Sequence, residues 1–336
     1  MADISVAILG LGRVGTSIGM ALKRYNRLGK AYNFDISGYD TVADQVKTAK
    51  KLEAIDHARH RPGEAVKDAG IVFITMPYGE IETVYELIGP ALRTNAVVLD
   101  FSTLKQEAMR AAQRHMPEQT HLVCGAPIFN PAYLFDGIDE TERATEDLFD
   151  KGMIMLMPSV RCAEEAITLA NDVTGILGAI PHFFDPNEHD ALINATEILP
   201  SVMTVAYFYT LSHNSGWPDT QRLTNPAFGM ASHDLFDTHP DDLAKLWMDG
   251  GEQLIRNINE LIKSLTHMRD LLQEKDQESI SAILESRSSE YAAWINRRYN
   301  LTWGKERTAE NLPTFSDAVG NMFGGFFKRR QDEEKK

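Results

Sequence analysis

The first half of the chain alternates short apolar runs with helix-forming stretches, which is the pattern of an α/β protein. The apolar runs lack charge on both faces, as buried parallel strands do. Predicted strands are residues 6–9, 34–40, 69–77, 96–100, 121–125, 152–157 and 180–184. Helix-forming stretches of about 10 to 15 residues separate most of them. The sequence therefore predicts a doubly wound parallel sheet, a Rossmann-type domain, over residues 1–185.

The second half of the chain carries helical patterns and no strand runs. The first predicted helix is 188–212, and the third is 277–298. The second begins at Leu243 and has apolar residues at 247, 254, 258, 261, 265, 268 and 272. A last helix is lined by Phe315, Val319, Met322, Phe323 and Phe326. Gly250-Gly251 interrupts the second, which indicates a kink or a close helix approach. We expect an all-helical substrate and dimerisation domain at 186–327, followed by a charged tail at 328–336. Such long apolar helices suggest a homodimer.

A glycine-rich stretch lies between the first strand and the first helix. It reads Gly10-Leu11-Gly12-Arg13-Val14-Gly15, the G-x-G-x-x-G pattern of dinucleotide sites. Gly10 permits the tight turn, Gly12 lets the backbone approach a pyrophosphate, and Gly15 lets the helix pack on the sheet. The amides at the start of that helix would face the diphosphate. We predict that residues 10–15 bind the cofactor.

The second predicted strand ends in Asp40, 25 positions after Gly15. A carboxylate there can accept hydrogen bonds from both ribose hydroxyls, and it would repel a 2′-phosphate. Because no arginine follows directly, the sequence favours NAD over NADP. A glycine-rich turn in an unrelated α/β protein is the alternative interpretation.

Composition restricts the other functions. At 336 residues two domains are expected. The net charge of −14 argues against nucleic acid and anionic membranes as partners. Cys124 and Cys162 fit no metal or redox spacing, so no metal is expected and a reduced compartment is favoured. The first strand leaves no room for a signal peptide, and no apolar stretch approaches the roughly 20 residues of a membrane span. We expect a soluble, cytoplasmic protein.

Open α/β sheets bind ligands at the carboxyl edge of their strands. Three predicted strands end there at 75–77, 100–103 and 125–129. Met76, Pro77 and Ser102 are therefore predicted to contact the cofactor, and Thr103 and Asn130 offer polar groups to a substrate. Ser102 or Thr103 could instead only cap the helix that begins near Leu104.

The order of motifs resembles the prephenate dehydrogenase family over roughly residues 3 to 275. The resemblance rests on the segments 10–15, Gly38-Tyr-Asp40, Glu53-Ala-Ile-Asp56, Glu64-Ala-Val-Lys67, Asp100-Phe-Ser-Thr-Leu-Lys105, Asp185-Pro-Asn-Glu-His-Asp190 and Leu199-Pro200. It implies oxidative decarboxylation of prephenate, or of its amino analogue arogenate, with NAD(P)+, in tyrosine biosynthesis. In that family a histidine accepts a hydrogen bond from the substrate hydroxyl as hydride leaves.

This chain departs from the family at several functional positions. Ala126 stands where the resemblance implies the histidine, Asp234 stands near the expected substrate arginine, and Glu197-Ile-Leu-Pro-Ser201 replaces Ser-His-Leu-Pro-His. Thr103 keeps the hydroxyl of the family's serine. The candidate catalytic residues are accordingly Thr103, Glu197 and Ser201. Glu197 could act as a base or pair with an amine of the substrate.

Other histidines and other functions stay open. His189 matches the family and is expected to order the interdomain helix rather than react, while His233 and His239 could supply an imidazole. A 3-hydroxyacid or imine-type reductase shares the two-domain plan, but Ala191 occupies the place of its lysine, three residues before Asn194. A non-catalytic NAD-binding regulator is the third possibility, because the family's histidine and arginine are unmatched.

Overall fold

A computed structural model describes residues 2–136, 140–233, 235 and 238–302 of the protein. The chain divides into two compact units, residues 1–257 and 258–336. The first contains the sheet and every predicted site residue. The predicted domain boundary at 185, where the strands end, stays a prediction. Asp234, the predicted helix at 315–326 and the tail at 328–336 lie outside the described residues.

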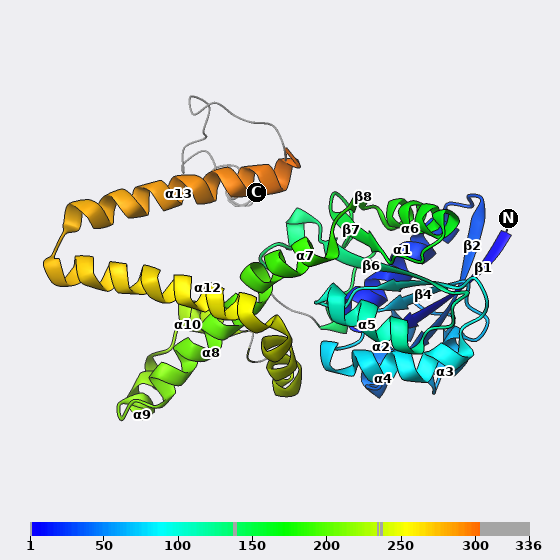
Figure 1. The fold of residues 1–336 in the computed structure, drawn as a ribbon, viewed down its shortest axis with the longest axis horizontal. Coiled ribbons are helices and arrows are strands. Elements are labelled where there is room, and N and C mark those ends of the chain that lie inside the picture. Colours follow the sequence, from blue (N-terminus) through cyan, green and yellow to red (C-terminus); the bar gives the residue numbers. More distant parts are fainter. Residues whose placement is uncertain (1, 137–139, 234, 236–237, 303–336) are drawn as a thin grey trace, which may run out of the picture. The chain divides into compact units, whose positions relative to one another are not determined.

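An eight-stranded sheet forms the centre of the first unit (Figure 1). The strands are β1 (Ala2–Leu9), β2 (Tyr32–Tyr39), β3 (His57–Ala58), β4 (Ile71–Ile74), β5 (Val97–Asp100), β6 (His121–Ile128), β7 (Met153–Pro158) and β8 (Ile180–Phe183). Their order is β3-β2-β1-β4-β5-β6-β7-β8. All neighbouring pairs are parallel except β6 and β7, which pair antiparallel. The predicted Rossmann-type sheet is confirmed, with one antiparallel pair.

Helices cover both faces of the sheet. They are α1 (Arg13–Arg27), α2 (Ala43–Lys51), α3 (Pro62–Val66), α4 (Ile81–Ile88), α5 (Lys105–His115) and α6 (Glu164–Leu177). One buried apolar cluster lies among α1, α2, α6 and the sheet, and the other lies among α3, α4, α5 and the opposite face. β4 and β5 are buried along their whole length, as expected of strands with a helix layer on each side.

Helices follow the last strand, as predicted. They are α7 (Pro186–Ile193), a π-helical segment (Asn194–Ile198), α8 (Leu199–Ser212), α9 (Trp217–Thr220), α10 (Pro226–Ser232), α12 (Pro240–Glu274) and α13 (Gln277–Asn300). α12 kinks at Gly251, whose φ of 52° is left-handed. A Cβ on Gly250 would lie 2.7 Å from the side-chain oxygen of Asn194. The kink and the close approach expected at these two glycines are both present.

The expectation that no apolar stretch is long enough for a membrane span is wrong for one segment. The helical run Pro186–Ser212 is 27 residues long with a mean hydropathy of 1.3. Few charges interrupt it after Asp190, which is why it meets the criterion. One such helix is weak evidence for a membrane, and Asp190 near its start accepts hydrogen bonds from two amides of α5.

Candidate functional site

The glycine-rich turn has the geometry that the motif predicts. Gly10 has a φ of +94°, and a Cβ there would lie 2.5 Å from the Thr75 carbonyl oxygen. A Cβ on Gly15 would lie 1.9 Å from the Gly10 carbonyl oxygen, so the turn and helix can meet only without that side chain. A Cβ on Gly12 would find nothing within 4 Å. Gly12 therefore leaves open space where the turn borders a cavity.

The start of α1 is equipped to hold an anion. Among the described residues, no side chain caps this helix, and its first turn carries no acidic residue. The first amides of a helix have no intrahelical acceptor and point along the positive end of its dipole. These donors fit a diphosphate.

Asp40 lies directly beyond β2 and faces the same turn. Its carboxylate accepts hydrogen bonds from the amides of Leu11 at 2.6 Å and Val42 at 2.7 Å. Burial raises the pKa of this carboxyl above its ordinary value, although the amide bonds oppose that effect. With its amide nitrogen oriented to donate, the Gln45 side chain also reaches this carboxylate, at 2.7 Å from Oδ2 and 3.2 Å from Oδ1. Asp40 is thus fixed beside the glycine-rich turn.

The acidic insert between β6 and β7 braces the turn. Thr141 Oγ1 donates to the Leu11 carbonyl at 3.0 Å, and Asp136 forms an ion pair with Arg13 at 2.6 Å. The Arg13 guanidinium also lies 5.4 Å from the centre of the Tyr133 ring. Asn130, a sequence candidate for substrate contact, uses its amide to close its own turn with Ala132 and Asp147.

Two adjoining cavities continue from this turn. The outer cavity, of about 660 Å³, is lined by residues that include Gly12, Asp40, Met76, Pro77, Thr103, Glu197, Ser201 and His239. The inner cavity, of about 670 Å³, is lined by residues that include Arg13, Val14, Met76, Ser102, Thr103, Ala126, His189 and Glu197. Thr75, Met76, Tyr78, Thr103, Thr196 and Glu197 border both. Gly10, Leu11 and Gly15 line neither cavity and act through the shape of the turn.

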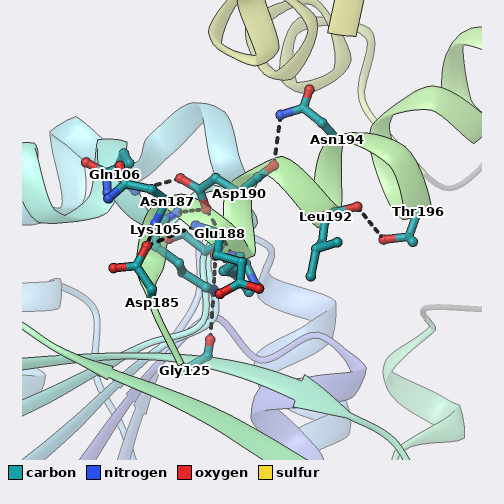
Figure 2. A network of polar contacts seen from close by, with 12 residues as sticks. Lys105, Gln106, Gly125, Asp185, Asn187, Glu188, Asp190, Leu192, Asn194 and Thr196 are labelled. Carbon is teal, nitrogen blue, oxygen red and sulfur yellow. Dashed lines mark hydrogen bonds and ion pairs between the residues drawn. The ribbon is translucent and has the colours of Figure 1, made fainter. Parts of the chain in front are cut away.

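At the inner end, Lys105 connects the residues that follow β5 to Gly125 within β6, and Figure 2 shows its bond to Gly125. This side chain is 1% exposed, and its Nζ donates to the carbonyl oxygens of Ser102 and, at 2.8 Å, Gly125. Burial lowers the pKa of the ammonium, and nearby acidic groups partly oppose this. Lys105 ends the Asp-Phe-Ser-Thr-Leu-Lys motif, but the sequence pattern alone does not predict this role at the site.

Asp190 of α7 joins the helical region to α5. Its carboxylate accepts the backbone amides of Lys105 at 2.8 Å and Gln106 at 2.9 Å, and Figure 2 shows it at the start of that helix. The suggestion that Ser102 or Thr103 caps α5 is wrong: the side-chain cap comes from 85 residues further along the chain. Ser102 and Thr103 instead line the inner cavity.

His189 and Glu197 reach the inner cavity from the same helical run. His189 is 5% exposed, its Nδ1 lies 2.9 Å from Asp190 Oδ1, and its buried Nε2 has no hydrogen-bond partner within the described part of the chain. Glu197 sits in the π-helical segment. Desolvation by burial raises the pKa of its carboxyl, and the positive charge of Lys105 opposes that rise. Ala126 faces the same cavity.

Other sequence candidates lie further from this end. Ser201 borders the outer cavity, where its hydroxyl donates to the Ile198 carbonyl at 2.7 Å and accepts from Trp247 Nε1 at 2.9 Å. His239 also borders the outer cavity, beside Asp241. Neither His233 nor His239 lines the inner cavity. The catalytic assignments of Thr103, Glu197 and Ser201 stay predictions.

The residues that the sequence analysis did not select are those whose role depends on distant contacts. Tyr78 lies between the cavities and donates to Asp249 of α12 at 2.8 Å. Tyr133 lines the inner cavity from the insert. The sequence feature that could have indicated a role for Lys105 is the Asp-Phe-Ser-Thr-Leu-Lys motif, which follows a buried strand. Among the described residues, no group of acidic, histidine and cysteine side chains is placed to hold a metal.

Comparison with known proteins gives concordant matches. Residues 18–180 match the family described as prephenate dehydrogenase, nucleotide-binding domain. The prephenate dehydrogenase of Bacillus subtilis is 22% identical over 280 residues, covering 82% of this chain and 72% of that protein. The cyclohexadienyl dehydrogenase of Zymomonas mobilis is 23% identical over 200 residues, covering 59% of this chain and 64% of that protein.

Solved structures share the fold. Prephenate dehydrogenase from Aquifex aeolicus, in complex with hydroxyphenyl propionate and NAD+, aligns with a TM-score of 0.71 at 19% identity, over 85% of this chain and 97% of that one. Synechocystis arogenate dehydrogenase aligns with a TM-score of 0.64 at 18% identity, over 87% of this chain and all of that one (100%). At these identities the likeness concerns the fold.

Proposed function

Because the chain belongs to the prephenate/arogenate dehydrogenase family, we propose that it is an NAD-dependent oxidoreductase that decarboxylates a cyclohexadienol. The observation that carries this proposal is the pair of adjoining cavities. One is bordered by Gly12 and Asp40, and the other ends at Lys105, His189 and Glu197. A dinucleotide held at the first would extend toward ionisable groups at the second.

The residues present fit NAD. Gly12 leaves open space at the uncapped start of α1, and Asp40 is held by two amides where ribose hydroxyls would approach. A carboxylate at this position disfavours the 2′-phosphate of NADP by charge repulsion. When bound, NAD+ supplies the hydride acceptor.

The protein's own residues would then handle the substrate. In the overall reaction the carbinol loses a hydride, the ring carboxylate leaves as carbon dioxide, and the electron pair of the broken carbon–carbon bond completes the aromatic ring. The hydroxyl proton is retained by the phenol product. Thr103 offers a hydroxyl where both cavities meet, and Lys105 fixes the strand ends that form the inner wall. Phe101 and Ile128 contribute apolar surface to the same cavity.

We further propose arogenate as the preferred substrate over prephenate. Both carry carboxylates, but arogenate has an ammonium group where prephenate has a keto group. Glu197 borders the substrate end of the cleft and can accept hydrogen bonds from an ammonium group when ionised. For prephenate the same carboxylate is a repulsive neighbour.

The test is NADH formation by the full-length protein with arogenate and with prephenate. We expect a higher kcat/KM for arogenate, and Glu197→Gln should lower it about tenfold while raising the prephenate value. Glu188→Gln is the matched control, because Glu188 lies on α7 and borders neither cavity. Binding of NAD without oxidation of either compound would refute the proposed function.

The alternatives have less support. The curated relatives are named as prephenate, cyclohexadienyl and arogenate/prephenate dehydrogenases, not as hydroxyacid or imine reductases. Ala191, which takes the place of the reductase lysine, is exposed on α7. A cytoplasmic location and a homodimer formed through the helical domain remain part of our proposal.

A further inference from the structure

The buried imidazole of His189 has a feature that the sequence did not predict. Asp190 accepts a hydrogen bond from its Nδ1, and the same carboxylate is held in place by the two amides at the start of α5. A ring that donates from Nδ1 has an acceptor lone pair at Nε2. The ring is therefore both oriented and fixed in one tautomer.

The acceptor atom of this ring, Nε2, forms no hydrogen bond that stabilises the described part of the fold. Nε2 is buried and has no partner within the described part of the chain, although His189 lines the inner cavity. A buried polar atom without a hydrogen bond costs free energy, so an unpaired one at a cavity wall indicates a group that a ligand satisfies. The same cavity contains Ala126, which offers no polar side-chain atom.

We propose that His189 Nε2 is the catalytic hydrogen-bond acceptor for the hydroxyl of the cyclohexadienol, an inference that rests on the proposed function. The imidazole shares the hydroxyl proton as hydride leaves the carbinol carbon. The proton returns to that oxygen when carbon dioxide leaves, so the balance of the reaction is unchanged. Asp190 is then a positioning residue.

Two other ionisable groups at this end of the cavity are less suited to the role. Lys105 directs two of its Nζ–H donors at the carbonyl oxygens of Ser102 and Gly125. These two bonds hold the cavity wall formed by the two carbonyl groups. The backbone amide of Lys105, at the start of α5, is bound by Asp190. Glu197 borders both cavities rather than the inner one alone, which suits it to the amine at the far end of the substrate.

The decisive variant is His189→Asn. An asparagine amide can still donate to Asp190 in place of Nδ1, but it offers nothing at the position of Nε2. We expect kcat to fall by about a hundredfold or more with little change in the affinity for NADH. His57→Gln is the matched control, because His57 also contacts an aspartate, Asp35 at 3.0 Å, on the surface far along the sheet.

A second measurement does not depend on turnover. In calorimetry with NAD+ present, the wild-type protein should bind hydroxyphenyl propionate about tenfold more tightly than phenyl propionate, because only the former gives Nε2 a donor. That preference should be lost in His189→Asn. Added imidazole should restore part of the activity of His189→Gly.

The outcomes separate two failures. If the wild-type protein turns over and His189→Asn retains its kcat within about threefold, with the preference for the hydroxyl ligand intact, the role of His189 is refuted while the proposed function stands. If the wild-type protein oxidises neither arogenate nor prephenate, the proposed function and the role of His189 fail together.

Discussion

At the scale of single residues, the three glycines of the turn differ in what they permit. Gly10 and Gly15 are required by the backbone, because an added Cβ would meet main-chain oxygen atoms at 2.5 Å and 1.9 Å. Gly12 is not required by the fold, since a Cβ there contacts nothing. The motif therefore combines two glycines that the backbone requires with one, Gly12, that has open space where a side chain would lie.

This difference gives a matched pair of variants. Gly12→Val should fold normally and lose measurable NAD binding, because its side chain would occupy the space of the diphosphate. Gly15→Val should fail to fold stably. Calorimetry with NAD and thermal unfolding of both proteins check the two expectations. Unchanged NAD affinity in Gly12→Val would contradict the assignment of the cofactor site.

Asp40 adds a pH dependence to cofactor binding. Burial raises the pKa of its carboxyl above that of an ordinary aspartate. The ionised form accepts the ribose hydroxyls, so affinity for NADH should fall on acidification at a higher pH than an unperturbed aspartate would give. Fluorescence titration of NADH between neutral and acidic pH measures this, and Asp40→Asn should bind weakly with no such dependence over the same range.

At the scale of elements, contacts between distant segments decide what the sequence could not show. Buried strands such as Ile71–Ile74 are apolar throughout and were predicted, whereas β3 consists of only two residues, His57 and Ala58, that pair with β2. β7 is as apolar as its neighbours, so nothing local distinguishes its antiparallel pairing with β6. The local sequence pattern thus predicts that a strand exists. It does not predict which strands will be its neighbours or whether they pair parallel or antiparallel.

The candidate site divides in the same way. The turn at Gly10–Gly15 and the carboxylate of Asp40 lie close in sequence to the elements that position them, and they were predicted. Asp190 acts on α5 across 85 residues, and His189 matters because of an atom left unpaired in the assembled cavity. No local periodicity contains that information.

The cap on α5 can be tested by itself. Asp190→Ala removes two hydrogen bonds from the helix start, and the loss of a cap costs about 1–2 kcal/mol of the free energy of unfolding. Chemical denaturation followed by circular dichroism measures it. Asp185→Ala, which removes the cap of α7, is the comparison, because Asp185 accepts from Asn187 and Glu188 without touching α5.

Helices α4 and α5 are also joined by an ion cluster. Arg114 and His115 bind Glu82 and hold the pKa of its carboxyl down at about 2. A depressed carboxyl pKa stabilises the fold above the ordinary glutamate range and ceases to do so as pH falls toward 2. Because these side chains are partly exposed, Glu82→Gln should cost only about 0.2–1 kcal/mol at pH 7. The difference should disappear near pH 2 and in high salt.

At the scale of the whole molecule, the described residues of the second unit leave an apolar face uncovered. In α12, Ile262, Leu265, Met268 and Leu272 recur at helical spacing and are 53%, 56%, 47% and 66% exposed. Exposed apolar patches of this kind mark protein–protein contacts. Of the predicted amphipathic stripe, residues 265, 268 and 272 are exposed within the described part of the chain, whereas Leu254 is buried.

The uncovered face of α12 leads to a prediction about the oligomeric state of the protein. We expect sedimentation equilibrium at micromolar concentration to give a homodimer. If the exposed faces of two copies meet, each copy buries four large apolar side chains, and this burial outweighs the free-energy cost of association. Leu265→Lys with Leu272→Lys should give a monomer that still binds NAD, since Gly12 and Asp40 lie in the first unit. Arg256→Glu with Lys263→Glu, a charge change on exposed positions of the same helix, is the control and should stay dimeric. A monomeric wild-type protein would require that the stripe be covered by something other than a second copy.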